Sequence, residues 1–139
     1  FFPETNESVR IDTLIQSIDL EISIVSRALN SFVVNEFESD GTKHIDKYRD
    51  YQNHLIIKKE GKKMIDTVFT KQTFAEFTGQ EFLGISNFHG YWFNNVTDNT
   101  VELFGLISKP ETDWTFAFYH YFDLKASKFT VMEYVDEEI

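Results

Sequence analysis

Large apolar side chains occupy both faces of the segment 114–122 when it is read as a strand. Four fall on one face and three on the other: Trp114, Phe116, Phe118 and Phe122 against Ala117, Tyr119 and Tyr121. A strand with apolar groups on both faces is typical of the interior of a sheet that is covered on both sides. The segment therefore predicts a sandwich or a partly open barrel and disfavours a single open sheet.

The rest of the C-terminal half has the pattern of an antiparallel meander. Strands are expected over residues 88–96, 101–108 and 129–135. Turn-forming residues separate them at 97–99, 109–113 and 123–127. Before this meander we expect one short helix over residues 71–78, stopped by Gly79, with Phe74 and Phe77 facing the sheet.

The N-terminal half also favours strands, although its first segment has two readings. Between Ile18 and Ile24, isoleucine and leucine alternate strictly with polar residues, which predicts a strand over about 17–26. The apolar spacing over 11–30 also fits a helical face, and a helix there is the alternative. Further strands are expected over residues 31–37, 43–51, 54–59 and 62–70, with hairpin turns at Asp40-Gly41 and Glu60-Gly61.

Length and composition agree with one mostly β domain. The 139 residues have the size of a single domain, and 17% of them are aromatic, a composition that favours sheets. Residues 1–10, which begin FFPETNESV, are interpreted as an N-terminal tether, and 11–139 as one β-rich globular domain. The expected fold is an antiparallel β-sandwich or partly open barrel with one short helix.

Charge and cysteine content limit the classes of function. The net charge of -10 disfavours nucleic acid as a partner, since a phosphate-binding surface needs clustered basic residues. The absence of cysteine excludes disulfides, thiolate metal sites and cysteine nucleophiles. No apolar run reaches the length of a transmembrane segment. Because the chain begins with Phe1 and not methionine, we expect an upstream segment that has been removed, such as a secretory or lipoprotein signal.

Catalytic and metal-binding patterns are weak. Ser86 and His89 lie close in sequence, but the spacing is wrong for a nucleophile elbow. None of the four histidines has the spacing of a helical metal site, so no metal or other cofactor is expected; they are His44, His54, His89 and His120. Loop carboxylates could serve as an acid/base pair, although turns commonly use Asp to cap the backbone; they are Asp98, Glu111, Asp113 and Asp123.

The surplus of aromatic residues gives the best binding candidates. Tyr91 and Trp92 place one large ring on each face of their strand, so one of them is expected to line a groove or a second packed layer. Asp113 and Trp114 stand at the loop before the most apolar strand, and Asp113 is expected to cap that loop. Gly90-Tyr91-Trp92 is similar to the G-x-W motif of lipocalins, but it lies past the middle of the chain.

A wider resemblance is carried by short segments spread along the chain. These are Ser31-Phe32-Val33-Val34, Lys47-Tyr48-Arg49-Asp50, Thr70-Lys71 with Phe74, and Lys109-Pro110-Glu111-Thr112-Asp113-Trp114. Over about residues 12–136 the sequence resembles a family of small Bacteroides-type lipoproteins known only as a domain of unknown function. The resemblance implies export and a lipid anchor on a cysteine upstream of Phe1, and it implies no catalytic residues.

The functional expectation is a non-enzymatic binding or structural domain of an exported, lipid-anchored protein, located outside the cytoplasm at the cell envelope or surface. Its ligand and protein partners are not indicated by the sequence. The alternatives are a lipocalin-like carrier of a small apolar ligand and an acid/base hydrolase that uses the loop carboxylates. A deep enclosed cavity would favour the carrier, and paired carboxylates in a cleft would favour the hydrolase.

Overall fold

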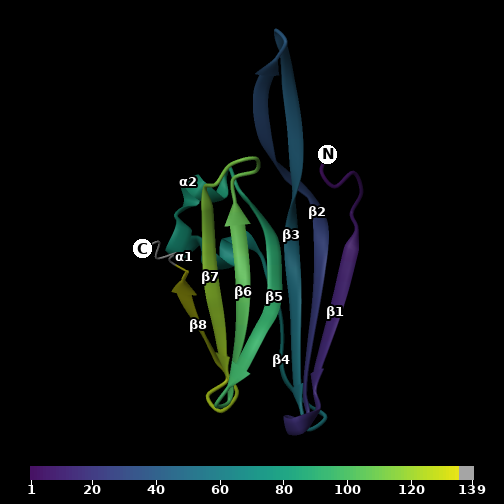
Figure 1. The fold of residues 1–139 in the computed structure, drawn as a ribbon, viewed down its shortest axis with the longest axis vertical. Coiled ribbons are helices and arrows are strands. Elements are labelled where there is room, and N and C mark those ends of the chain that lie inside the picture. The colour runs from purple at the N-terminus through teal and green to yellow at the C-terminus, as the bar shows by residue number, and fades with distance from the viewer. Residues whose placement is uncertain (135–139) are drawn as a thin grey trace.

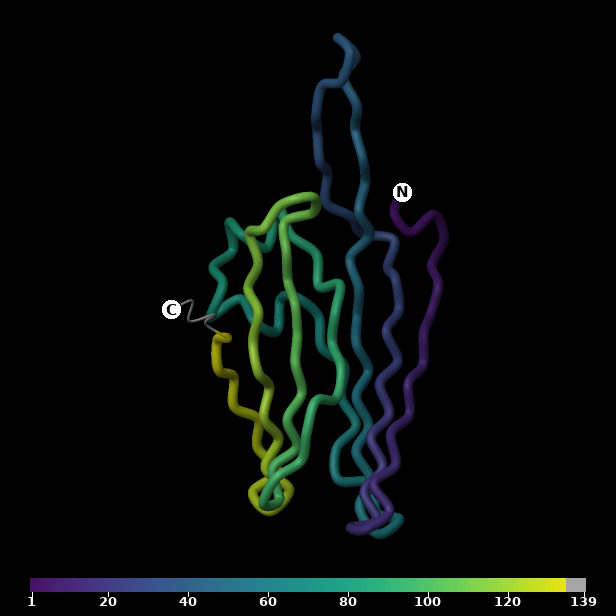
Figure 2. Tube along the Cα trace, in the orientation of Figure 1, coloured from purple at the N-terminus to yellow at the C-terminus, as the bar shows by residue number. Residues whose placement is uncertain are grey.

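Two four-stranded antiparallel sheets form a β-sandwich (Figures 1 and 2). The computed structural model describes residues 1–134. The first sheet has the order β1-β2-β3-β4, with strands Ser8–Ile15, Leu20–Ser39, Thr42–Lys59 and Lys62–Phe69. The second has the order β5-β6-β7-β8, with strands Asn87–Thr97, Thr100–Ser108, Thr115–Asp123 and Lys128–Glu133. The predicted fold class is confirmed, as a sandwich with no closed barrel among the described strands. Residue 135, the last of the predicted final strand, lies outside the described residues.

Residues 11–15 and 20–30 are strand and not α-helix, as the alternation at Ile18–Ile24 favoured. The predicted start at residue 17 is wrong, because the 3-10 turn η1, Gln16–Ile18, separates β1 from β2. Asp19 closes this turn with a φ of 48°. The strand also continues far beyond residue 26, through the predicted strand 31–37, with one irregularity in its pairing to β3 between Ala28 and Phe32. Residues 43–51 and 54–59 likewise form one strand, β3.

The tether interpretation of residues 1–10 needs correction. Ser8–Arg10 belong to β1, and their backbone pairs with Ser26 and its neighbours on β2. Phe2 also pairs with β3: its amide donates to the Lys47 carbonyl at 2.7 Å, and its carbonyl accepts from the Arg49 amide at 2.9 Å. Backbone hydrogen bonds to a distant strand leave no periodic pattern in a polar sequence, so the sequence of residues 1–10 does not indicate this pairing.

Both tight hairpins form where the dipeptides predicted them. Asp40 and Gly41 have φ values of 53° and 75°, and Glu60 and Gly61 have 53° and 76°. Two successive residues with positive φ give the turn whose twist matches that of the paired strands. The β2–β3 hairpin extends well past the end of the second sheet, and its tip projects freely (Figure 1).

The expected helix is shorter and more broken than predicted. Lys71–Phe74 is a 3-10 turn, η2, in which Thr70 and Thr73 form a reciprocal capping box. It is followed by two single-turn helices, α1 at Ala75–Thr78 and α2 at Gln80–Leu83. Phe74 is fully buried as expected, but Phe77 is half exposed and does not face the sheet. None of the helices among residues 1–134 has the length and apolar character needed to cross a membrane.

The core is one continuous cluster between the two sheets. It contains the inward-facing residues of β7, namely Phe116, Phe118, His120 and Phe122, together with aromatic side chains from η2, α2, β4 and β5. β7 is an interior strand of its sheet, as predicted. The prediction that both of its faces are covered is wrong, because Tyr119 and Tyr121 lie partly exposed on the outer face. Rings from neighbouring strands pack on each other there, with Phe104 lying 5.2 Å from Tyr119.

Candidate functional site: a groove beside the edge strand

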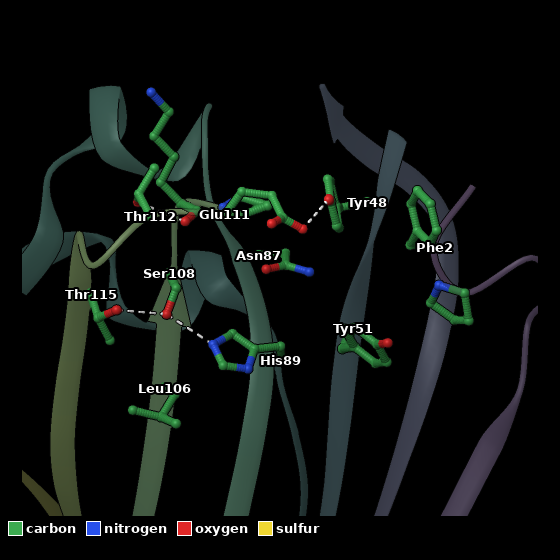
Figure 3. A pocket seen from close by; sticks show the side chains of 13 residues that line it. Phe2, Tyr48, Tyr51, Asn87, His89, Leu106, Ser108, Glu111, Thr112 and Thr115 are labelled. Atoms are coloured by element: carbon green, nitrogen blue, oxygen red, sulfur yellow. Dashed lines mark hydrogen bonds between the residues drawn. The ribbon is translucent and has the colours of Figure 1, made fainter. Parts of the chain in front are cut away.

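A concave surface lies where the two sheets meet at one end of the sandwich (Figure 3). A cavity of about 570 Å³ opens there between β3, the start of β5, β6 and the loop 109–114. A second hollow of about 390 Å³ continues it along β5 and shares Tyr51, His89 and Leu106 with the first. We call these two hollows together the groove. It opens to solvent along its length.

The stagger of the two sheets creates the groove. The edge strand β5 contacts β3 and β2 of the first sheet. Beyond β5 the inner face of that sheet continues toward β1, where Val9 and Ile11 are more than half exposed. Tyr51 and Asn53 belong to the same face of β3 as the core residues Leu55 and Ile57, but they lie where this cover ends. They form part of the floor, and Val9 of β1 extends it.

A chain of three polar side chains crosses the upper part of the groove. The Nε2 atom of His89 lies 2.8 Å from the Ser108 hydroxyl, which lies 2.9 Å from the Thr115 hydroxyl. His89 occupies a bulge in β5, because the pairing with β6 shifts between Phe88 and Gly90. Burial lowers the pKa of His89, so its imidazole is neutral at pH 7. Within residues 1–134 no carboxylate bonds to the His89 ring. These three side chains can therefore form hydrogen bonds, but they lack the carboxylate that orients the histidine in a catalytic triad.

A hydrogen bond crosses one end of the groove, which we call its mouth. The Tyr48 hydroxyl donates to Oε1 of Glu111 at 2.6 Å and so links β3 to the β6–β7 loop (Figure 3). Burial, together with the hydrogen bond to Glu111, raises the pKa of Tyr48 to about 12. Glu111 has a φ of 63°, an uncommon conformation that turns the loop at this point. The phenol therefore remains a neutral donor at any physiological pH.

The guanidinium of Arg49 fixes the position of the N-terminal residues that form the groove wall next to this mouth. It donates to the carbonyl oxygens of Pro3 at 2.9 Å, Glu4 at 3.1 Å and Leu29 at 3.0 Å. These bonds join the N-terminal residues to the irregular part of β2. As a result Phe2 stacks on Tyr48, with ring centroids 5.3 Å apart and an interplanar angle of 27°. The half-exposed ring of Phe2 thus becomes part of the groove.

One buried amide on the groove floor is incompletely bonded. Asn53 is 1% exposed, and its Oδ1 accepts a hydrogen bond from the Ser26 hydroxyl at 2.5 Å. Its Nδ2 has no hydrogen-bond partner among the described residues. A buried donor of this kind is costly unless a water or a ligand accepts from it. Asn53 is therefore a buried polar residue of the groove floor with one hydrogen-bonding group unused.

The structure brings together only two of the four predicted binding residues. Trp92 is 38% exposed and lines the groove. Tyr91 also lies in the groove wall, but it is 5% exposed and its hydroxyl bonds to His120 inside the core. Trp114 is 58% exposed and packs on Phe82 at 5.2 Å, outside the groove. Trp114 lies outside β7, whose pairing with β6 begins at Thr115. Its ring therefore does not join the buried face of that strand, contrary to the prediction from the sequence pattern.

Asp113 also lies outside the groove, and its predicted capping role is wrong. The loop is capped by Thr112, whose hydroxyl donates to the Lys109 carbonyl at 2.8 Å and accepts from the Trp114 amide at 3.1 Å. Threonine and aspartate are both common loop caps, so the sequence could not show which of two neighbours turns inward.

The loop carboxylates do not form a pair. Glu111 stands at the mouth of the groove, whereas Asp98 belongs to the β5–β6 turn at the opposite end of the second sheet (Figure 1). Asp123, at that same far end, accepts from the amides of Lys125 and Ala126 and caps the β7–β8 turn. No group of three or more metal-ligating side chains occurs within residues 1–134.

Sequence reasoning did not bring together the residues that build the groove, although it considered His89 as a histidine ligand and Glu111 as a loop carboxylate. Tyr48, Tyr51, His89, Ser108 and Glu111 come from three strands and a loop. Their polar side chains gave no motif, since Ser108 is 19 residues from His89 and Glu111 is 63 residues from Tyr48. The only local signal was the run of aromatic and polar residues in 47–51, which is also the pattern of an edge strand.

Residues 3–126 match the family model described as "Domain of unknown function (DUF4738)", and the chain belongs to this family. The resemblance to a family of unknown function is thereby confirmed. No curated protein matches the sequence.

Proposed function

We propose that this DUF4738 domain is a non-enzymatic binding domain whose groove takes a neutral, polyhydroxylated ligand, of which an oligosaccharide is the natural example. The observation that carries the proposal is the row of partly exposed aromatic rings beside neutral hydrogen-bonding groups in one open groove. Sugar rings present C–H groups that pack on aromatic faces and hydroxyls that bond to amides, phenols and imidazoles.

The aromatic component consists of four rings placed along the groove. Phe2, Tyr48 and Tyr51 stand at the upper part, and Trp92 stands farther along β5. Phe2 and Trp92 are 51% and 38% exposed. A single exposed aromatic ring is common on a protein surface, but several exposed rings gathered in one concave surface are typical of a binding site. Their clustering here supports a binding role.

The polar component favours a neutral ligand over an anionic one. The hydrogen-bonding groups include the neutral imidazole of His89 and the hydroxyl of Ser108, and the amide of Asn53 lies buried in the groove floor. The carboxylates in the groove wall, Glu7 and Glu111, would repel a negatively charged molecule. The net charge of -10 acts in the same direction.

The shape of the groove favours an extended ligand over an enclosed apolar one. A lipocalin-like carrier needs a cavity inside its sheets, and in the described residues that space holds the packed rings of Phe74, Phe88 and Phe118. An acid/base hydrolase needs two carboxylates within reach of one bond. Asp98 and Glu111 stand at opposite ends of the second sheet, and Glu7 and Glu111 line different hollows of the groove.

Tryptophan fluorescence provides a direct test. The chain has two tryptophans, so the Trp114→Phe variant leaves Trp92 as the single reporter inside the groove. We expect a neutral oligosaccharide from a panel of differing linkages to change its emission saturably. We expect Trp92→Ala to weaken binding by calorimetry about tenfold or more, as is typical of a central aromatic contact. Trp114→Ala is the matched control and should bind normally.

Two results would overturn this proposal. The first is the failure of every neutral oligosaccharide in the panel to bind the folded protein. The second is equal binding by the wild type and the Trp92→Ala variant, which would place the ligand elsewhere.

We further propose that the chain is the exported part of a lipid-anchored protein of the cell envelope. The support is the resemblance carried by segments such as Lys109–Trp114. Expression of the complete reading frame with radiolabelled fatty acid tests this. Label incorporated into the protein, and lost when an upstream cysteine is replaced by serine, is the expected result; an unlabelled cytoplasmic protein would contradict it.

A further inference from the structure

The outer edge of β1 is an unpaired strand edge. β1 pairs with β2 along its whole length, and within residues 1–134 no other strand pairs with it. The Ala28 amide donates to the Glu7 carbonyl at 2.9 Å, which shows that Glu7 points its backbone groups toward β2. Because direction alternates along a strand, Ser8, Arg10, Asp12 and Leu14 point their amides and carbonyls toward the free edge.

This edge has little of the usual protection against pairing. Natural edge strands are kept apart by charged side chains, especially lysine, and by proline, bulges or short length. The edge strand β4 begins with Lys62-Lys63, and the edge strand β8 begins with Lys128. In contrast, β1 has eight residues without lysine, proline or glycine and without a bulge in its pairing. Three of its apolar side chains are more than half exposed: Val9 at 54%, Ile11 at 59% and Leu14 at 57%.

The charges of β1 are complementary to those of a second, antiparallel β1. When two copies pair about a twofold axis at Ile11, Arg10 of each lies opposite Asp12 of the other. A shift of two residues in either direction places Arg10 opposite Arg10 or Asp12 opposite Asp12, which is unfavourable. One register is therefore selected by charge. Arg10 and Asp12 are exposed and lie 3.1 Å from each other, and Asp12 also contacts Ser23 of β2, so the new pairing has only these surface contacts to replace.

We propose that β1 is a self-association edge, through which a second copy of this chain pairs antiparallel about Ile11 to form one continuous eight-stranded sheet. The pairing would satisfy the free backbone groups of Ser8, Arg10, Asp12 and Leu14 in both copies. It would also place Val9 and Ile11 of both copies on one face, the face that forms the groove floor. The two grooves would then adjoin across the twofold axis. This inference does not depend on the identity of the groove ligand.

Charge reversal tests the proposed register. Sedimentation measurements over a concentration series should show a reversible dimer of the wild-type protein. Arg10→Asp and Asp12→Arg each place like charges opposite each other at two symmetric positions. Each should weaken dimerisation about tenfold or more, because two attractions become repulsions.

The swapped double variant, Arg10→Asp with Asp12→Arg, should restore the dimer, because it recreates the complementary pattern. A mixture of the two single variants should form a heterodimer for the same reason. Thermal unfolding of each variant serves as the control for folding, which these exposed positions should leave intact. Ile11→Lys, which puts a lysine pair on the axis, is a second variant expected to be monomeric.

Three outcomes would overturn the proposal. The first is a wild-type protein that stays monomeric at all concentrations. The second is a dimer that persists unchanged in both single variants and in Ile11→Lys. The third is a swapped double variant that is folded but fails to recover the dimer. Oligosaccharide binding by a monomeric wild-type protein would reject the self-association edge and leave the groove proposal standing.

Discussion

The hydroxyl of Tyr91 lies 2.8 Å from Nδ1 of His120 inside the aromatic core. The two residues stand on β5 and β7, with β6 between them. His120 is 2% exposed, and its ring stacks on Phe129 at 4.5 Å. Burial lowers the pKa of His120 to about 4 and raises the pKa of Tyr91 well above its usual value. Both residues are therefore neutral at pH 7, and the core accepts them only in that form.

This pair predicts a dependence of stability on pH. An unfolded histidine titrates near a pKa of about 6.5, so between pH 6.5 and 4 the unfolded chain binds a proton that the folded chain does not. The free energy of unfolding should fall by about 3 kcal/mol as the pH drops through this window. Urea unfolding at several pH values measures it. His89, whose pKa is also lowered, adds to the effect.

The variant His120→Gln isolates the contribution of His120, because glutamine can hydrogen-bond but does not titrate. Its stability should be lower than that of the wild type at pH 7 and should fall less steeply between pH 6.5 and 4. Parallel pH profiles for the two proteins would contradict the assignment.

Gly105 is predicted to be intolerant of any side chain. It lies on β6 opposite Phe118, and a Cβ atom placed on it would stand 2.3 Å from Cζ of that ring. Because Phe118 is fully buried, its ring cannot move without disturbing the core. Gly105→Ala should cost about 1–3 kcal/mol or more in thermal or chemical unfolding. Gly84→Ala is the control: its nearest neighbour would lie 3.5 Å away, and the change should be neutral or slightly stabilising.

The loop 109–114 should depend on Thr112 and not on Asp113. Thr112→Ala removes two hydrogen bonds to the loop backbone and should lower stability by about 0.5–2 kcal/mol, the usual range for a lost cap. Asp113→Ala removes an exposed side chain and should change stability by no more than about 0.5 kcal/mol. Melting curves of the two variants, compared side by side, decide between them; a larger effect for Asp113→Ala would reverse the assignment.

A largely buried ion pair ties the helical segment to the first sheet. Nζ of Lys71 lies 3.0 Å from Oδ1 of Asp50, and it also donates to the Ser86 carbonyl at 2.8 Å. Lys71→Met leaves the Asp50 carboxylate without its partner and should cost about 3 kcal/mol, measured by chemical unfolding. The double variant with Asp50→Leu should cost less than the sum of the two single changes, since it removes both charges. Strict additivity would show that the two charges are not coupled.

The sequence alone determined the secondary structure of most of the chain. The alternation at Ile18–Ile24 and in 114–122 identified strands, and Asp40-Gly41 and Glu60-Gly61 located two hairpins. These signals are local: side-chain direction repeats every two residues in a strand, and positive φ is easy for only a few residue types. Boundaries were less certain, as η1 and the early start of β1 show.

Only the tertiary structure decided which surfaces meet. The offset between the sheets exposes Tyr51 and Asn53 on a face that is otherwise core, and it turns Trp92 into a groove residue while Trp114 lies outside. The contacts between His89 and Ser108 and between Tyr48 and Glu111 join strands that are far apart in sequence. A strand pattern specifies that one face is buried, but the partner of that face depends on how two sheets pack. That packing is set by many weak long-range contacts, which no local pattern records.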